Sequence, residues 1–546
     1  HRTAQPSQHP SCAQQDSEFS MELPPAKHIK TLPSDAWERI HERFDQPNVV
    51  VPPPPPPPEQ PPAPSLTEPM LRICAARPVV PGEEVDVLIQ MRMPEFPEGE
   101  RVPVDIICVL DISGSMSMEA KIQSSEGSGG LNLLDVAKHG VKTVMHALQD
   151  QDRLALVLFD SFAETCWELT EMTTEGRQKC EEKLKDVNTR GATNIWNGLA
   201  EGLRVCRQGQ GDGSQKRLAH LILLTDGQTA ERNEVLPRMM NAKGAEERLP
   251  CTVSTFGFGY NIDSKLLVDM AHGGFGVYSF IPDAGFVGTI FVNYISNILT
   301  TMSLSAMLVL DPEGGEIHEV YGGLKVEDAG NGCKRLDLPT VQYGQSKDIV
   351  LRMSAGGEDA YLSAKATYTM ADGEERETPL QEGLVTDATS ISEVSLQLWR
   401  SRFADLLEQV LSINESESLK LLSDLSSTIQ QKSLEDGYDQ DPFILHLLQD
   451  LQGEAIDAVE LAAFTKWGRH YLPSLMFAHR RQMCNNFKDP GVQHYGGEMF
   501  QALRDEADEK FNQLPPPEPT RSNVRGYTYS APPVRSMAMY NDASAG

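Results

Sequence analysis

Oxygen-bearing side chains follow an apolar run in the sequence DISGSM, which begins at Asp111. The preceding run, VDIICVL, has the character of a buried strand, and Ser113 and Ser115 fall on the short loop after it. A second apolar run, LILLTDG, reaches Asp226 near its end, and the segment GATNI between the two runs presents Thr193. Carboxylate and hydroxyl oxygens are hard donors, which Mg²⁺ and Mn²⁺ prefer. If the two strands are parallel, these residues meet at one sheet edge and predict a divalent-metal site.

The elements that must position these residues lie in an alternating segment, 102–301. Its short, near-continuous apolar runs suit parallel strands that are covered on both faces: 104–110, 153–159, 218–224 and 252–258. Helical patterns intervene, at 131–148, 175–187, 194–206, 234–246, 264–272 and 286–299. The alternation predicts an α/β fold with a doubly wound, mostly parallel sheet of the Rossmann-like kind, in which ligands bind at the carboxyl ends of the strands.

The three motifs, in this order, resemble the von Willebrand factor A (VWA) domain and its metal-ion-dependent adhesion site. The resemblance implies that Asp111 anchors the loop and that Ser113 and Ser115 ligate the metal through their hydroxyls. It also implies that Thr193 ligates directly or through water. Asp226 would act through water or as an acceptor behind the ligands. The Gly- and Ser-rich stretch SMEAKIQSSEGSGG after the motif is longer than in compact members of the family. Three interpretations are open: it gates access to the metal, it contacts a partner, or it is a tolerated surface loop.

Charge arithmetic suggests how such a site works. A divalent ion between the carboxylates of Asp111 and Asp226 gives a local sum near zero, and the hydroxyls add no charge. The ion then keeps an open coordination position that an Asp or Glu of a protein partner can fill. The sequence therefore predicts a metal-dependent protein-binding module and not an enzyme.

Two flanking segments, 69–101 and 302–387, alternate apolar and polar residues with the period of half-buried strands. Neither is long enough to form a sandwich alone, and Asp372-Gly373 marks a hairpin turn in the second. We expect the two segments to close one β-sandwich, with the VWA-like segment inserted between its parts.

Residues 388–514 show helical periodicity without sustained heptads, which predicts a compact helical domain. Within it, the run WGRHYLPSLMFAHRRQMCNNFKDPGVQHYGGEMFQALRDEAD resembles the helical region of VWA-Hint type proteins (Vwaint) and of plant VWA/RING proteins. The spacing of His470, His479 and His494 fits no single ligand face, so they are predicted to be packed or solvated.

Both ends of the chain are predicted to be disordered. Residues 1–68 are poor in aliphatic side chains and contain the uninterrupted prolines Pro52–Pro58, which favour a stiff polyproline II spacer. A proline-reading domain is the alternative partner for this run. The tail 515–546 is rich in Ser, Pro, Tyr and Arg.

The composition excludes some partners. Acidic residues number 78 and basic residues 48 among 546, a formal charge of −30, which argues against nucleic acid and against an anionic membrane surface. No apolar run approaches the length of a membrane span, so no membrane insertion is predicted. The nine cysteines form no CxxC pair, which is typical of reduced thiols and predicts a cytoplasmic protein. The chain opens at His1 rather than Met, so secretion stays an alternative.

Two other functions remain open. The chain lacks GxxxxGK[ST], GxSxG and HExxH, and it holds no cysteine cluster for a RING finger. The first alternative is therefore a substrate-binding part of a ubiquitin-ligase assembly whose RING lies outside this chain. The second is a scaffold whose VWA-like domain works without a metal.

Overall fold

The structure, a computed structural model, describes residues 66–520 except 79, 98–100, 121–129, 212–216, 244–247, 357–361 and 384. The predictions for the proline run Pro52–Pro58 and for most of both ends lie outside the described residues. No helix in the described part of the chain is long and apolar enough to cross a membrane. The eight cysteines within these residues are free thiols.

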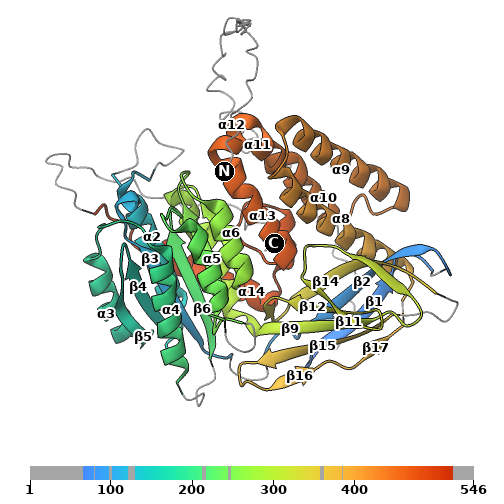
Figure 1. Cartoon of the computed structure of the whole chain (residues 1–546), viewed down its shortest axis with the longest axis horizontal. Coiled ribbons are helices and arrows are strands. Elements are labelled where there is room, and N and C mark those ends of the chain that lie inside the picture. Colours follow the sequence, from blue (N-terminus) through green and yellow to red (C-terminus); the bar gives the residue numbers. More distant parts are fainter. Residues whose placement is uncertain are drawn as a thin grey trace, which may run out of the picture. The chain divides into compact units, whose positions relative to one another are not determined.

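A six-stranded sheet in the order β5-β4-β3-β6-β7-β8 forms the centre of the VWA-like segment (Figure 1). Its strands pair in parallel, except β5, which is antiparallel to β4. The strands are β3 (Val104–Asp111), β4 (Arg153–Phe159), β5 (Ala163–Glu171), β6 (Leu218–Thr225), β7 (Thr252–Phe258) and β8 (Phe275–Ile281). The carboxyl ends of β3 and β6, which carry the predicted metal residues, are therefore neighbours.

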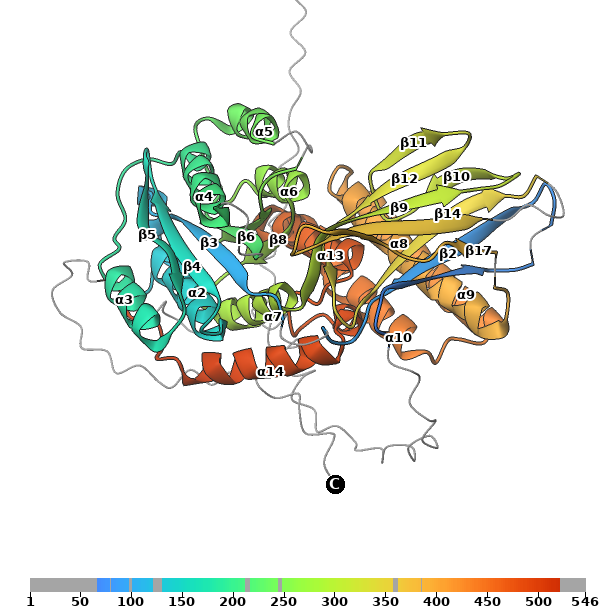
Figure 2. The same cartoon turned by 90° about the horizontal axis from the view of Figure 1, so that it is seen from below.

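Helices cover both faces of this sheet (Figure 2) because its strands are apolar on both sides. Ile107 and Val109 of β3 pack in one core, with α4, α5 and α6. Ile106, Cys108 and Leu110 pack in the other, with α2, α3 and α7. The helices are α2 (Leu133–Ala147), α3 (Thr174–Lys185), α4 (Ile195–Gln210), α5 (Arg232–Asn241), α6 (Ser264–Gly273) and α7 (Val287–Leu299).

The segments on either side of this domain form one β-sandwich of two antiparallel sheets. The first sheet has the order β1-β2-β14-β10, with β1 (Met70–Ala75), β2 (Glu84–Arg92), β14 (Ser346–Ser354) and β10 (Glu316–Val320). The second has the order β11-β12-β9-β15-β16, with β13 and β17 at its margins. Its strands are β9 (Thr301–Asp311), β11 (Val326–Gly330), β12 (Cys333–Leu338), β13 (Val341–Gln342), β15 (Ser363–Met370), β16 (Glu375–Glu377) and β17 (Gln381–Glu382).

Strand β2 shows how the two flanking segments depend on each other. It pairs with β14 along its whole length, from Glu84↔Ser354 to Arg92↔Ser346. Val87 and Ile89 enter the sandwich core, as their alternation predicts. The opposite face is not solvated, however: Leu88 is buried against α8 (Ala388–Val410). The half-buried interpretation of this strand was therefore wrong on that face, because a helix distant in sequence covers it.

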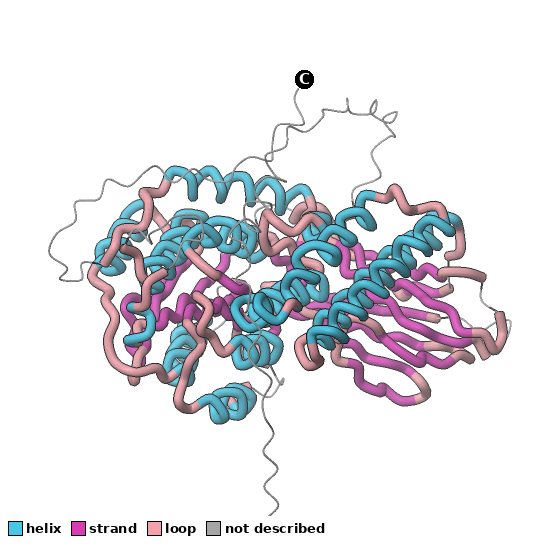
Figure 3. Tube along the Cα trace, turned by 90° about the horizontal axis from the view of Figure 1, so that it is seen from above, coloured by secondary structure: helices cyan, strands magenta, loops and turns pink. Residues whose placement is uncertain are grey.

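Helices follow the sandwich and return to the VWA-like domain. The first three of these helices are α8, α9 (Glu415–Asp436) and α10 (Pro442–Asp450). Short helical turns follow, including α11 (Ile456–Val459) and α12 (Leu461–Ala463), and the chain then forms α13 (Arg469–Arg481). Figure 3 shows helices layered beside the sandwich strands. The last helix, α14 (Glu498–Gln513), packs on α7 and α2, where the Phe511 ring closes over Gly288.

Two consecutive residues bind both crossings, the segments by which the chain enters and leaves the inserted domain. Gly344 N donates to Pro94 O (2.7 Å) on the incoming chain, and Tyr343 N donates to Thr300 O (2.9 Å) on the outgoing chain. We call Tyr343-Gly344 the staple. The start of α14 contacts it as well, because a Cβ on Gly497 would lie 2.2 Å from the carbonyl oxygen of Gly344.

These observations confirm the predicted fold class: a doubly wound, mostly parallel sheet inserted in a β-sandwich and followed by a helical region. The predicted hairpin at Asp372-Gly373 joins β15 to β16. Within the VWA-like segment, two strands were not predicted, β5 and β8.

Candidate metal centre

Asp111 is the last residue of β3, and its fully buried carboxylate organises the loop that follows. Its Oδ1 accepts a hydrogen bond from Ser113 N (2.8 Å), which turns the chain back over the strand end. Its Oδ2 accepts from the Thr225 hydroxyl at 2.5 Å. Both oxygens of Asp111 thus hold the loop after β3 against the end of β6, the anchoring role that the resemblance implies.

Ser113 and Ser115 lie side by side on this loop. Their Oγ atoms are 3.1 Å apart, and Ser115 belongs to a short 3-10 turn, η1 (Gly114–Ser117). Around a Mg²⁺ ion with ligands at about 2.1 Å, neighbouring oxygens of an octahedron are separated by about 3.0 Å. The spacing of the two hydroxyls therefore suits adjacent positions on one small cation.

Asp226 follows β6 directly and lies close to the Ser115 hydroxyl. It is 1% exposed, yet its Oδ2 has no hydrogen-bond partner among the described residues. Burial raises the pKa of the Asp226 carboxyl, opposed by the nearby Ser115 hydroxyl and the Gln228 amide. Burial, and then the charge of Asp226, raise the pKa of Asp111 to about 7. Two buried carboxylates that disfavour each other's ionisation, one with an unpartnered oxygen, fit a site for a cation.

The loop that carries Thr193 lies at the same edge. Gly114 N donates to Gly191 O (3.1 Å), and the Thr229 hydroxyl donates to Thr193 O (3.1 Å). The side chain of Thr193 is half-buried, and its hydroxyl has no hydrogen bond with any described residue. The structure therefore brings the Thr193 loop to the loops after β3 and β6, as the sequence predicts, and leaves the hydroxyl available.

Two polar residues that shape this edge were not singled out from the sequence. Thr225 is fully buried and binds Asp111, although it stands directly before Asp226 in the quoted motif. Asp160 follows β4 and accepts hydrogen bonds from Phe162 N (2.8 Å) and Arg190 Nε (2.9 Å). Its position after a buried strand is the signal that identified Asp111, and it could have been found in the same way.

The chemistry of the donor set is that of hard oxygen ligands. Among the described residues, no group of three or more His, Cys, Asp and Glu side chains could hold a metal ion. As predicted, the histidines are packed elsewhere: His470 and His479 are buried, and the His494 ring lies against Phe443 in a tilted arrangement. A cation at this edge would be bound by serine hydroxyls and water, with Asp111 and Asp226 balancing its charge.

Comparison with known proteins agrees with this fold. The von Willebrand factor type A domain family matches residues 105–291, and the family described as VWA / Hh protein intein-like (Vwaint) matches residues 441–509. A von Willebrand factor type A structure from Catenulispora acidiphila aligns with a TM-score of 0.51 at 16% identity, covering 70% of this chain and 89% of that one. The chain is therefore a VWA-domain protein. Its VWA domain is combined with a Vwaint region at the C-terminal side.

Curated relatives share the VWA domain. The chain is 26% identical over 177 residues to inter-alpha-trypsin inhibitor heavy chain H3 of Homo sapiens, and 31% identical over 111 residues to the E3 ubiquitin-protein ligase WAVH1 of Arabidopsis thaliana. These matches cover 31% and 20% of this chain. They span only 18% of the heavy chain and 14% of the ligase.

Proposed function

We propose that this chain is a metal-dependent protein-binding module, in which a Mg²⁺ or Mn²⁺ ion at the edge after β3 and β6 accepts an Asp or Glu carboxylate from a protein partner. The observation that carries the proposal is the buried, unpartnered Oδ2 of Asp226. A buried carboxylate oxygen without a partner is costly, and a cation offsets that cost.

The residues of this edge have separate tasks in the proposal. Ser113 and Ser115 supply the direct ligands, and Thr193 is the third hydroxyl within the loop cluster. Asp111 keeps the loop in place through its contacts with Ser113 N and Thr225, and Asp226 balances the charge. The bound ion supplies an electrophilic position for a carboxylate on a protein whose formal charge is −30.

An exposed aromatic ring near the same loops favours a protein as the partner. Phe162 is 77% exposed, the largest value among the exposed large hydrophobic residues. It stands on the turn after β4, where Asp160 N donates to Phe162 O (2.8 Å) and the Asp160 carboxylate accepts from Phe162 N. Because the backbone of Phe162 is held in this way, only its side-chain torsions lose freedom on binding, and aromatic rings commonly dominate protein interfaces.

The similarity to WAVH1 supports a second candidate, in which this module is the substrate-binding part of a ubiquitin-ligase assembly with its RING outside this chain. Both candidates use the same partner-binding edge, and neither requires catalysis by this chain. We propose a cytoplasmic location for either one. They differ in what happens to the partner: with E1, E2 and a RING protein added, only the second predicts transfer of ubiquitin to a captured partner.

The metal is tested with the isosteric variant Asp226→Asn, followed by titration calorimetry with MgCl₂ and MnCl₂. We expect measurable binding to the full chain and at least a tenfold weaker affinity in the variant, because the charge that balances the ion is removed. Asp150→Asn is the control, since its side chain is 70% exposed and remote from the loops. Equal metal affinity in all three proteins would contradict the assignment and favour the alternative function, a scaffold whose VWA domain works without a metal.

Partner capture gives the second readout. Binding of a partner should be lost in EDTA and restored by Mg²⁺ or Mn²⁺, and neutralising one acidic residue of that partner should have the same effect. Capture that is indifferent to the chelator would move the interface away from the metal edge.

A further inference from the structure

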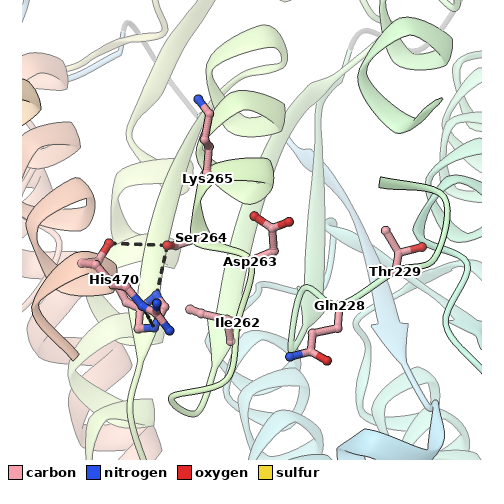
Figure 4. Close-up of a pocket in the computed structure, with 8 residues that line it drawn as sticks. Gln228, Thr229, Ile262, Asp263, Ser264, Lys265 and His470 are labelled. Carbon is pink, nitrogen blue, oxygen red and sulfur yellow. Dashed lines mark hydrogen bonds between the residues drawn. The ribbon is translucent and has the colours of Figure 1, made fainter. Parts of the chain in front are cut away.

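A polar pocket of about 500 Å³ begins beside the metal edge and ends on the helical region (Figure 4). Gln228 and Thr229, from the loop that also carries Asp226, line one side. Ile262, Asp263, Ser264 and Lys265 line the middle, and Arg469 and His470, at the start of α13, line the other side. The pocket is thus built from the VWA domain and the Vwaint region together.

Hydrogen bonds connect the pocket to the metal edge and fix its far wall. Gln228 N lies 3.4 Å from Asp226 Oδ1, and the Thr229 hydroxyl donates to Thr193 O. At the far wall, His470 Nδ1 lies 3.0 Å from the Ser264 hydroxyl, and its Nε2 lies 3.2 Å from Tyr260 O. Burial lowers the pKa of His470 to about 4, so the ring is neutral at physiological pH and serves to hold α13 against α6.

The two cationic side chains of this pocket, Lys265 and Arg469, are more exposed than its one carboxylate, Asp263. The carboxylate of Asp263 is already used, since it caps α6 by accepting from Leu266 N (3.1 Å) and pairs with Arg232. Lys265 is 77% exposed, and among the described residues its one ion-pair partner is Asp269, at 3.5 Å. Arg469 is exposed and takes part in none of the ion pairs among the described residues. Arg469 Nε donates to His470 Nε2 (3.2 Å). On a chain with a formal charge of −30, two exposed cationic side chains in one pocket are a local exception.

We infer that this pocket receives a second acidic side chain of the partner, so that the recognised segment carries one carboxylate for the metal and another for Lys265 and Arg469. The inference rests on the proposed metal-dependent function and adds a specificity for doubly acidic segments. An extended chain advances about 3.3 Å per residue, so the two acidic residues would be a few positions apart. Because Arg469 belongs to the Vwaint region, this recognition requires both parts of the chain.

The test uses the full chain and a phage-displayed library of random dodecapeptides, bound in Mg²⁺ and eluted with EDTA. Peptides selected on the unaltered chain should share one acidic residue and a second acidic residue at a fixed short spacing. The double variant Lys265→Gln/Arg469→Gln should retain the first preference and lose the second. Lys179→Gln/Lys420→Gln is the matched control, since it removes the same charge from exposed positions on α3 and α9.

A double-mutant cycle with one selected peptide makes the result quantitative. Changing its second acidic residue to the amide should weaken binding about tenfold on the unaltered chain and on the control, but not on Lys265→Gln/Arg469→Gln. Affinity for Mg²⁺ alone should be the same in all proteins. EDTA-eluted peptides with a single acidic residue, or an equal tenfold loss on Lys265→Gln/Arg469→Gln, would overturn the pocket assignment alone. A library without EDTA-eluted peptides would overturn the metal-dependent function, and this inference with it.

Discussion

At the scale of single residues, Asp450 and His479 form a buried pair away from the metal edge. Both side chains are fully buried, and His479 Nε2 lies 3.4 Å from Asp450 Oδ2. Asp450 Oδ1 accepts from Gly491 N (3.1 Å), and His479 Nδ1 lies 2.7 Å from the Tyr495 hydroxyl. Burial raises the pKa of Asp450 to about 7 and lowers that of His479 to about 3. Both groups therefore favour their neutral forms in the folded chain.

The raised pKa of Asp450 makes stability depend on pH. The folded state binds this proton more tightly than the unfolded state, whose ordinary pKa is 3.8, so its contribution to stability is complete below pH 3.8 and is lost as pH rises through 7. Asp450→Asn keeps the acceptor for Gly491 N without ionising. Relative to the unaltered chain, its free energy of unfolding should rise by on the order of 1 kcal/mol per pH unit up to about pH 7 and change little above it. Urea unfolding at pH 5 to 8 measures this, with Asp424→Asn on the exposed side of α9 as control. Identical pH profiles for Asp450→Asn and the unaltered chain would contradict it.

Individual residues of the metal edge were predictable to different degrees. Asp111, Ser113, Ser115 and Asp226 follow apolar runs, and the parallel pairing of β3 with β6 brings them to one edge. The hydrogen bond from Thr225 to Asp111 was not predictable, because it depends on how two strand ends are aligned in space. The pocket was not predictable from the sequence either, because Arg469 is 243 positions after Asp226 in the chain, 469 − 226, and no local pattern relates them.

At the scale of elements, the start of α14 is fixed by a contact between two backbones. Gly497, the N-cap residue of α14, has an ordinary φ of −79°, yet an added Cβ would lie 2.2 Å from the Gly344 oxygen. Gly344 itself has φ +70°, a conformation that side chains disfavour. The absence of a side chain at Gly497 thus permits the close approach of the two backbones.

Gly497→Ala should therefore push α14 away from the staple. We expect a loss of about 1–3 kcal/mol in the free energy of unfolding, the usual cost of overpacking. Faster proteolysis within α14 should accompany a lower urea midpoint. Gly373→Ala is the comparison, because its φ of +76° carries backbone strain while its Cβ would meet nothing within 4 Å. A smaller effect at Gly497 than at Gly373 would show that the close approach is unimportant.

Strands and helices were predicted best where the pattern of apolar residues within the element itself indicates its type. The buried strands β3, β4, β6 and β7 each form an uninterrupted apolar run. Strand β5 lies at the sheet edge with mostly half-exposed residues, so its pattern is weak. The second buried face of β2 depends on α8, which is about 300 residues later. Tertiary contacts of this kind override local patterns.

At the scale of the whole molecule, the sandwich requires strands from both sides of the VWA domain. Strand β14 pairs with β2 on one side and β10 on the other, so a fragment of residues 302–410 would leave one edge of β14 unpaired. We expect that fragment to aggregate, since an apolar unpaired edge recruits other chains. Joining residues 66–101 to it through a short Gly-Ser linker should restore a soluble product with a cooperative unfolding transition. A soluble, cooperatively unfolding 302–410 fragment would show that the two β segments are independent.

The staple has a consequence for how this architecture can change over generations. Because consecutive residues, Tyr343 and Gly344, hold the outgoing and incoming crossings, the two ends of a 200-residue insertion, 102–301, leave the sandwich almost at one point. For the rest of the chain, the whole VWA domain is then equivalent to one long hairpin loop. Gene rearrangements could shorten, exchange or duplicate that loop without shifting the register of any sandwich strand. The same platform is thus open to domains with other binding chemistry, provided that their own ends lie equally close together.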